Sequence, residues 1–535
     1  MLKRFARSLS SLSLSLSKFR VLFLLVALSA FHYSIFTSQA YANNIIVSNV
    51  SLYKAAGQPN GTIGVKFDVV WDNSFTSVDN NGQTFFDRAW VFVKYFDAAN
   101  AGTDTAWSHA TLISGGTVSS YNAQSGTGIS ADQKGAFCRP GTNQVVYWDY
   151  ATDGVSPSAS ISVKVMAIEM VYVPTGSFYV GSGGTETNAF YSYPNTTSPY
   201  KISSEDSIIV GTATGNLYYP NSNTYGGDQA GPIPAAFPKG YNGFYMMKYE
   251  VNQGQYRDFL NTLNRAQQNQ RAGNGTTLAS GTTSVTNIYV MANTSVAANI
   301  ASASNYRSGI RCDAAIPATT PITFYCDYNN NGTPNESTDG EWIACNYVSW
   351  PDLCAYADWA GLRPFTELEF EKASIGLMNP IANEYAWGPT APTAGPTGPT
   401  NPGANNETAT NNANCSYNGT VSGPMRSGFA ATSSSSRYAS GGSYYGIMEL
   451  SGNLWERPVT VGNSTGRLFI GSHGDGSLST TNTDWPGTNA TGSGYRGGGW
   501  STGSSYARVS DRIYAAYTDA GRYYYVGIRC ARTSP

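Results

Sequence analysis

Short runs of alternating hydrophobic and polar residues fill the first third of the chain. The alternation is clearest in Val65–Val69 and Ser160–Val165, and clusters of Gly, Asn, Asp and Pro separate the runs. A period of two is typical of strands that bury one face. We therefore expect residues 43–167 to form an all-β sandwich domain. Its predicted strands are Ile45–Val50, Val65–Trp71, Trp90–Tyr95, Ala106–Ile113, Val145–Trp148 and Ser160–Ala167.

From about residue 168 onward, helical spacing appears. In Val251–Leu263, hydrophobic residues recur every three or four positions, which predicts an amphipathic helix with Asn252 as its N-cap. A second helix is predicted at Pro351–Ala360, and a third begins at the capping box Thr366–Glu369. The second helix has Ser349 as its N-cap. Helices, strands and loops together predict an α+β domain over residues 168–535.

Long stretches of this second part show no periodicity. Residues 391–414 are dense in Pro, Gly, Thr and Asn and are expected to form an exposed loop. Residues 183–238 and 266–320 are expected to be further insertions.

The N-terminus is typical of an export signal. Basic residues precede the apolar run Val21–Phe36, and Ala40–Ala42 supplies the small residues of a peptidase site. We expect residues 1–42 to be a signal peptide, with an uncleaved N-terminal anchor as the alternative. No later segment reaches the length of a membrane span. With the signal peptide removed, the mature chain is expected to be exported from a bacterium, either secreted or at the cell surface.

The composition excludes several classes of protein. Only 12% of residues are charged and the net charge is −2, so no basic surplus exists to bind nucleic acid. The chain has three histidines, and one of them, His32, falls in the signal peptide. Two remaining histidines are too few for a His-based metal cluster.

Seven cysteines are spread along the chain without any Cys-x-x-Cys motif. They are Cys138, Cys312, Cys326, Cys345, Cys354, Cys415 and Cys530. In an oxidising compartment we expect some of them to pair, with at least one left over.

A series of motifs in the second part occurs in one fixed order. The motifs are Met170–Ser182, Tyr249–Tyr256, Val348–Trp350, Gly361–Glu371, Gly446–Glu456, Arg496–Trp500 and Gly527–Cys530. In this order they resemble the formylglycine-generating enzyme (sulfatase-modifying factor) family over about residues 168–532. The resemblance implies a variant of the C-type-lectin-like fold.

The resemblance does not extend to the catalytic residues of that family. Its enzymes bind copper through two cysteines five residues apart, and the matching positions here are Thr502 and Ala507. Neither side chain can replace a thiolate as a Cu(I) ligand. We therefore expect no copper and no oxidase activity, while an enzyme of this family remains the alternative.

The same resemblance implies a structural calcium site. The matching ligands are the side chains of Glu449 and Glu456 and the carbonyl groups of Gly452 and Leu454. Oxygen donors of this kind suit a hard cation. The alternative is a metal-free, hydrogen-bonded turn. Another stretch, Asp327–Gly332, resembles the start of an EF-hand loop but has Thr338 at the twelfth position, and is interpreted as a turn.

Residues 501–525 use a restricted set of amino acids. Tyrosine is frequent, the rest are mostly Ser, Ala, Gly, Thr, Asp and Arg, and Asn is absent. Lys, Glu, Gln, Met and Trp, which have no codon ending in cytosine, are also absent. This pattern resembles the variable region of target proteins of diversity-generating retroelements, in which adenines of AAC codons are randomised. The alternative is an ordinary Gly- and Tyr-rich chain end.

The resemblance places a variable region at about residues 496–530. Within it, Arg508, Val509, Ser510, Arg512, Ala515, Ala516 and Arg522 are expected to be fixed scaffold residues. The predicted ligand-binding residues are Trp500, Ser501, Thr502, Ser504, Ser505, Tyr506, Asp511, Tyr514, Tyr517, Asp519, Tyr523, Tyr524 and Tyr525. Tyr, Ser and Gly are also the residues that antibody paratopes favour.

These patterns predict an exported, non-catalytic binding protein. Its partner is expected to be a macromolecule on the surface of another cell, a phage or a host. A calcium-dependent sugar binder is the third hypothesis, although no calcium-and-sugar motif of true lectins occurs.

Overall fold

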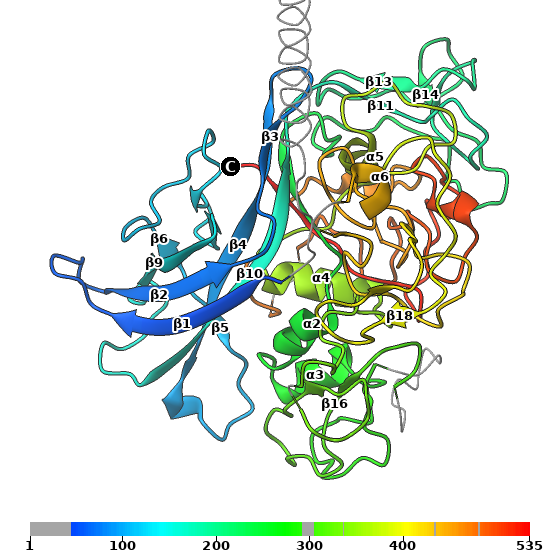
Figure 1. The fold of residues 1–535 in the computed structure, drawn as a ribbon. Coiled ribbons are helices and arrows are strands. Elements are labelled where there is room, and N and C mark those ends of the chain that lie inside the picture. Colours follow the sequence, from blue (N-terminus) through cyan, green and yellow to red (C-terminus); the bar gives the residue numbers. More distant parts are fainter. Residues whose placement is uncertain (1–43, 292–303, 335, 433–434, 480–481) are drawn as a thin grey trace, which may run out of the picture.

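The longest strands of the protein form two antiparallel sheets (Figure 1). The structure is a computed structural model that describes residues 44–291, 304–334, 336–432, 435–479 and 482–535, so the predicted signal peptide lies outside the described residues. The first sheet has the order β1-β2-β9-β6. Its strands are β1 (Ile46–Tyr53), β2 (Thr62–Val70), β9 (Gly141–Asp149) and β6 (Leu112–Ile113).

The second sheet combines strands from the first third of the chain with β15 and the late strand β20. Its order is β20-β15-β10-β4-β8-β7, and β3 and β5 pair with β4. The strands are β3 (Thr76–Val78), β4 (Thr84–Asp97), β5 (Ser108–His109), β7 (Gly128–Ile129), β8 (Ala136–Cys138), β10 (Ile161–Val173), β15 (Phe244–Met247) and β20 (Ala531–Thr533).

Strand β4 is buried on both faces. Val91 and Val93 point into a core between the two sheets, together with Phe67 and Trp148. Trp90 and Phe92, which alternate with them, point into the larger core on the other side. This explains why the sequence around Trp90 is continuously hydrophobic rather than alternating.

The second sheet crosses the predicted domain boundary at residues 167 and 168. Strand β10 pairs with β4 from Ile161 to Val171 and with β15 from Met170 to Val173. The two sheets enclose a core as in a sandwich, but one of them continues into the second part. The division into two domains stays a prediction, because a strand shared between them does not define a boundary.

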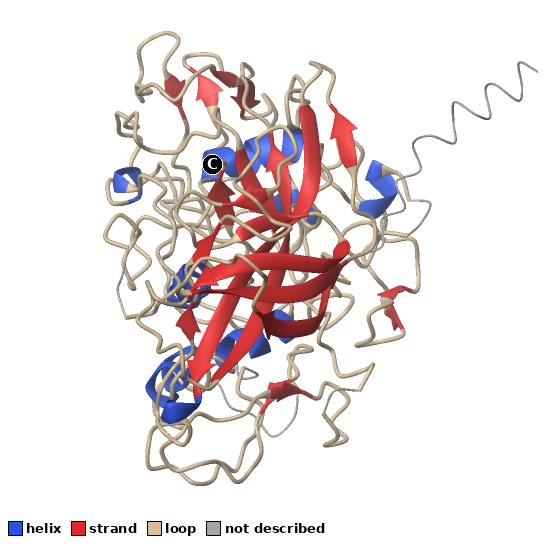
Figure 2. Ribbon diagram, turned by 90° about the vertical axis from the view of Figure 1, so that its left-hand side faces the viewer, coloured by secondary structure: helices blue, strands red, loops and turns tan. Residues whose placement is uncertain are grey.

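The second part consists of short helices, two-residue strand pairs and long loops. The helices lie behind the sheets when the molecule is viewed from the side of β1 and β2 (Figure 2). They are α2 (Gln253–Leu260), α3 (Arg265–Arg271), α4 (Trp350–Trp359), α5 (Glu367–Ile375), α6 (Arg437–Ser440) and the 3₁₀ turns η1 (Ala98–Asn100), η2 (Gly466–Leu468) and η3 (Ser504–Ala507). The remaining strands are β11 (Phe178–Val180), β12 (Tyr191–Ser192), β13 (Tyr200–Ile202), β14 (Leu217–Tyr218), β16 (Ile310–Arg311), β17 (Tyr325–Cys326), β18 (Pro399–Thr400) and β19 (Thr408–Ala409).

The predicted helix starts are confirmed. Asn252, Ser349 and Thr366 each accept a hydrogen bond from the backbone of the third helical residue, and each forms a capping box. The observed elements confirm an α+β fold. Within the residues that the structure describes, no helix has both the length and the apolar character needed to cross a bilayer.

The expected cysteine pairing is not found. All seven cysteines are free thiols, and six of them are buried. Cys138 lies between the two sheets and Cys415 packs beside Ala507, whereas the other five belong to or pack against the larger core. Burial raises the pKa of the Cys138 thiol to about 12, so this group remains protonated.

Candidate functional site

Residues 501–525 follow an irregular path on the right-hand side of Figure 1, where η3 is the short red helical turn. Backbone hydrogen bonds hold this path to the rest of the fold. Four of them join the amide of Asn418 to the carbonyl of Thr502, Val509 to Glu384, Arg512 to Thr187 and Trp455 to Tyr525, at 2.8–3.0 Å. Because these bonds use main-chain atoms, they do not depend on which side chains the segment carries.

Most of the predicted scaffold residues are buried on the inner side of the segment. Val509, Ser510, Arg512 and Ala515 are fully buried, and Arg522 nearly so. Arg508 and Ala516 are half-buried. The side chains expected to be fixed therefore form most of the inner face of the segment.

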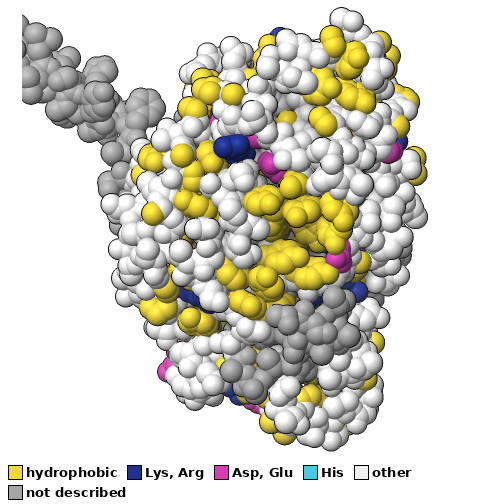
Figure 3. All heavy atoms as spheres, turned by 90° about the vertical axis from the view of Figure 1, so that its right-hand side faces the viewer, with side chains coloured by type: hydrophobic (Ala, Val, Ile, Leu, Met, Phe, Trp, Pro, Cys, Tyr) yellow, Lys and Arg dark blue, Asp and Glu magenta, His cyan; other side chains and the backbone are white. Residues whose placement is uncertain are grey.

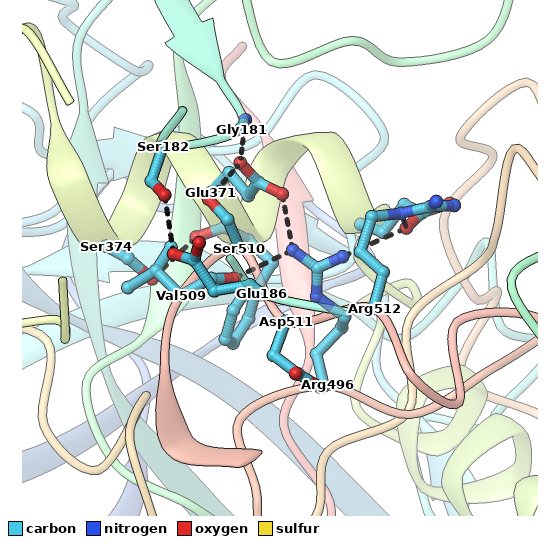
Figure 4. Close-up of polar contacts among 12 residues, drawn as sticks. Gly181, Ser182, Glu186, Glu371, Ser374, Arg496, Val509, Ser510, Asp511 and Arg512 are labelled. Atoms are coloured by element: carbon cyan, nitrogen blue, oxygen red, sulfur yellow. Dashed lines mark hydrogen bonds and ion pairs between the residues drawn. The ribbon is translucent and has the colours of Figure 1, made fainter. Parts of the chain in front are cut away.

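A network of buried ion pairs joins this inner face to helix α5 (Figure 4). The Arg512 guanidinium binds Glu367 through Nε and Nη2, at 2.8 and 3.1 Å. Arg496 binds both Glu367, at 3.1 Å, and Glu371, at 2.5 Å. Burial by itself would raise the pKa of Glu367, but Arg512 and Arg496 hold it below its ordinary value. The Glu367 carboxylate is therefore charged, and its pairs with Arg512 and Arg496 form a fixed electrostatic link.

A second buried pair holds the end of the segment. The Arg522 guanidinium binds the Asp352 carboxylate of α4 at 2.6 and 2.8 Å, and Arg271 binds the same carboxylate at 3.1 Å. Asp352 also completes the capping box of α4. One buried carboxylate thus ties the segment to the start of a helix.

Above this framework lies a cleft of about 450 Å³. Its walls are aromatic and hydroxyl-bearing side chains: Tyr225, Trp455, Tyr495, Ser501, Thr502, Tyr514, Tyr517, Tyr524 and Tyr525. Figure 3 views this side of the molecule and shows hydrophobic side chains, tyrosine included, gathered over the middle of the face. The volume is within the usual range of ligand pockets.

The rings that line the cleft pack against one another. Tyr517 contacts Tyr225 edge to face, with ring centroids 4.7 Å apart, and Tyr495 at 5.9 Å. Tyr514 lies 5.6 Å from Trp455 in the same manner. Such contacts restrict the rings before a ligand arrives. The cleft is therefore largely pre-formed.

Six of the predicted binding residues line this cleft: Ser501, Thr502, Tyr514, Tyr517, Tyr524 and Tyr525. Of the others, Tyr506 packs on Trp455, and Ser504 and Ser505 lie on η3. The Asp519 carboxylate accepts hydrogen bonds from the hydroxyl groups of Tyr523, at 2.6 Å, and Tyr517, at 3.4 Å. It therefore positions these two rings.

Two predicted binding residues need a correction. Trp500 is 5% exposed, because its ring is buried against Tyr306 and Tyr524 and its indole NH donates to the Tyr524 carbonyl at 3.0 Å. Asp511 is also 5% exposed, and its carboxylate accepts from backbone amides instead of facing solvent. Both residues support the face but do not present groups on it.

Four aromatic residues at the site lie outside the predicted set. Tyr225 and Tyr306 belong to the two predicted insertions. Trp455 is part of the Gly-Asn-Leu-Trp-Glu motif, and Tyr495 directly precedes the Arg-Gly-Gly motif. Tyr306 stacks on Tyr524 with ring centroids 4.4 Å apart. The position of Trp455 and Tyr495 in or beside these motifs was the one sequence signal that could have placed them at the site. Nothing local distinguishes Tyr225 or Tyr306 from other loop tyrosines.

The predicted calcium ligands lie in a buried, acidic region. Glu449 and Glu456 each have one carboxylate oxygen that is buried and forms no hydrogen bond with the described residues. Their other oxygens accept from the Gly428 amide at 2.7 Å and from Arg529 at 2.6 Å. Burial raises the pKa of both groups to about 7.

These residues fit a hard cation. The two unpartnered oxygens would be satisfied by coordination, and Glu449 holds an unfavourable positive φ of 55°. The described chain contains no group of three or more His, Cys, Asp or Glu side chains close enough to share a metal ion. The candidate site therefore depends on two carboxylates together with the carbonyls of Gly452 and Leu454.

Thr502 and Ala507, which occupy the copper-ligand positions of the formylglycine-generating enzymes, do not fit copper. The Thr502 hydroxyl exchanges hydrogen bonds with the Gly499 backbone at 2.9 and 3.0 Å, and Ala507 is a buried methyl group. Cys415 packs in the same cluster as Ala507, but a single buried thiol with a raised pKa is a poor Cu(I) site.

Comparison with known proteins gives the following matches. A solved structure titled "Structure of PvdO from Pseudomonas aeruginosa" is 16% identical, with a TM-score of 0.30, over 68% of this chain and 94% of that one. Treponema denticola variable protein 1 is 13% identical, with a TM-score of 0.27, over 69% and 96%. No curated protein matches the chain. The model of the sulfatase-modifying factor enzyme 1-like domain matches residues 158–534, and the chain therefore belongs to this family.

Proposed function

We propose that this protein is an exported, non-catalytic binding protein whose ligand occupies the aromatic cleft. In this proposal, residues 501–525 are a diversified region on a C-type-lectin-like domain, and residues 43–167 form an N-terminal module that shares a sheet with it. The partner is a macromolecule on another cell, a phage or a host. The replacement of both copper ligands, by Thr502 and Ala507, supports a role without oxidase activity.

One observation carries the proposal. The side chains of residues 501–525 include a buried set, with Val509, Arg512 and Arg522 among them, and a cleft-facing set of Tyr, Ser and Thr. The Val509 and Tyr525 positions illustrate the two sets, since one is fully buried and the other lines the cleft. This division would allow the cleft-facing side chains to change while the buried ones keep the segment in place.

The division makes the genetic test specific. We expect the flanking DNA to contain a near-copy of the segment in which the mismatched adenines fall in codons for cleft-facing residues such as Tyr514, Tyr517 and Tyr525. Codons for Val509, Ser510 and Arg512 should match in both copies. A reverse transcriptase gene should lie nearby. If the flanking DNA lacks the copy and the gene, or if mismatches fall equally on buried codons, the diversification proposal is wrong.

We also propose that Ca²⁺ binds Glu449, Glu456 and the carbonyls of Gly452 and Leu454 as a structural ion. This turn connects directly to the cleft, because Trp455 lies between two of the ligands in sequence and forms part of the cleft wall. The ion would neutralise buried carboxylates and fix the turn.

Export rests on residues 1–42 alone. N-terminal sequencing of the protein recovered outside the producing cells is expected to begin at Asn43. A chain that retains Met1 and remains with the membrane fraction would instead support the uncleaved anchor.

A further inference from the structure

The chemistry of the cleft restricts what can occupy it. Among the described residues that line it, none carries a charged side chain: the lining consists of six tyrosines, Trp455, Ser501 and Thr502. A charged ligand group buried there would lose its hydration without gaining an ion-pair partner, which is costly. The Asp519 carboxylate, which contacts the cleft-lining Tyr517, is already bonded to Tyr523 and to the Gly521 amide. The occupant should therefore be uncharged.

The same lining offers two kinds of contact together. Aromatic faces bind the C–H faces of a flat, apolar ring surface, while the hydroxyl groups at the ring edges donate and accept hydrogen bonds. A pyranose sugar presents both features on one small body, since its axial C–H groups form an apolar face and its hydroxyls surround the ring. A cleft of about 450 Å³ has room for such a group.

One buried group in the cleft points to a hydroxyl-bearing ligand. Tyr495 is buried, yet its hydroxyl forms no hydrogen bond with the described residues. An unpartnered buried hydroxyl costs free energy, which a ligand hydroxyl would recover. The Arg457 guanidinium lies 4.4 Å from the centroid of the Tyr495 ring and so holds this side chain in place.

We propose that the cleft binds a neutral carbohydrate, with pyranose rings stacked on the half-buried rings of Tyr517 and Tyr525 and a hydroxyl bonded to Tyr495. This inference rests on the proposed function and specifies the chemical class of its ligand. A protein partner is less suited, because protein interfaces are broad and their energetic centres are enriched in Arg as well as aromatic residues. Here the aromatic surface is concave and lacks Arg.

The test uses the mature protein with an array of neutral and acidic glycans, followed by calorimetry on the neutral glycans that bind. Binding is expected for neutral glycans and not for their sulfated or uronic-acid counterparts. Tyr517→Ala should weaken binding at least about tenfold, since it removes an aromatic face. Tyr53→Ala, which changes an exposed tyrosine on β1 outside the cleft, should leave binding unchanged.

The Tyr495→Phe variant tests the unpartnered hydroxyl. It removes only the oxygen, so we expect unchanged or higher thermal stability together with binding about 3–10-fold weaker. Equal affinity of Tyr495→Phe and the unchanged protein would show that the Tyr495 hydroxyl does not bond to the ligand. Binding only to acidic glycans, or neutral binding that survives Tyr517→Ala, would overturn the assignment.

A cell-binding assay separates failure of this inference from failure of the proposed function. Whole cells are treated with periodate, which oxidises sugars, or with a protease, and are then mixed with the protein. Binding that needs Tyr517, survives periodate and is lost after protease treatment keeps the binding function and rejects the carbohydrate. If neither cells nor arrayed glycans bind through the cleft, both proposals fail.

Discussion

Arg512 and Glu367 form a fully buried, two-point ion pair that joins the segment below the cleft to helix α5. The Arg512 guanidinium also lies 3.9 Å from the centroid of the Phe190 ring. The N–H edge of the guanidinium thus binds the carboxylate and its planar face stacks on the ring, which a lysine cannot reproduce.

Breaking this pair should strongly destabilise the protein. Arg512→Ala is expected to lower the free energy of unfolding by about 3 kcal/mol or more, because a buried carboxylate loses a partner. Arg508→Ala, in the same segment but half-buried, should cost less than about 1 kcal/mol. Urea denaturation of both variants gives the comparison. Equal losses would show that the buried network does not anchor the segment.

The division into buried and cleft-facing residues predicts different tolerance to the same substitution. Tyr517→Ser removes a half-buried ring and should cost about 1 kcal/mol. Val509→Ser leaves a cavity and buries a hydroxyl, and should cost about 2–4 kcal/mol. Thermal unfolding measures both. A Tyr517→Ser variant as unstable as Val509→Ser would contradict a segment that accepts diverse side chains on its outer face.

Calcium should stabilise the folded chain. At a hundred times its dissociation constant, the ion would add about 2.7 kcal/mol, which corresponds to a rise of about 2–3 °C in the melting temperature of a protein of this size. Chelator should reverse the rise, and Glu456→Gln should abolish it. Glu384→Gln, which changes a buried carboxyl elsewhere, should keep the calcium response. A response unaffected by Glu456→Gln would place any bound calcium at another site.

Glu384 predicts a measurable pH dependence of stability. Burial raises the pKa of this carboxyl to about 7, whereas an unfolded glutamate has a pKa of about 4.3. Between these values the folded protein binds the proton more tightly, so the contribution of Glu384 to stability falls as the pH rises from about 4 to about 7. The groups facing it are Glu186, Glu371 and Arg437.

The variant Glu384→Gln removes that titration and keeps an oxygen to accept the Ile381 amide, now bonded at 2.7 Å. Its free energy of unfolding should match that of the unchanged protein near pH 4 and exceed it by about 2–3 kcal/mol near pH 8. Denaturation curves across this range provide the test. A difference that does not vary with pH would mean that Glu384 titrates at an ordinary pKa.

Local signals in the sequence predicted the regular elements well. The caps Asn252, Ser349 and Thr366 were readable because a cap depends only on residues within one turn. Helix α3 was missed because Arg265–Arg271 carries no hydrophobic stripe, although Asn264 caps it in the same way. The sandwich boundary was placed inside β10 because a strand buried on both faces gives no sign of where its neighbours change.

The sequence predicted only part of the site. The restricted residue types marked Tyr514, Tyr517 and Tyr525, and the structure brings all three to one cleft. Composition could not distinguish these tyrosines from Asp511, because Asp also belongs to the restricted set of residue types although Asp511 is buried. Tyr225 is nearly 300 residues away in sequence from Tyr517, so only the folded chain shows that their rings touch.

The edge strand β20 begins six residues after Tyr525, and its pairing with β15 completes the second sheet. Ala531 also exchanges two backbone hydrogen bonds with Arg363, at 2.8 and 2.9 Å. A chain whose translation stops, or shifts frame, anywhere within 501–525 lacks all of these contacts and cannot finish the sheet. The fold thereby places a structural requirement downstream of the segment proposed to change, so that only copies read through in the correct frame can form this part of the sheet.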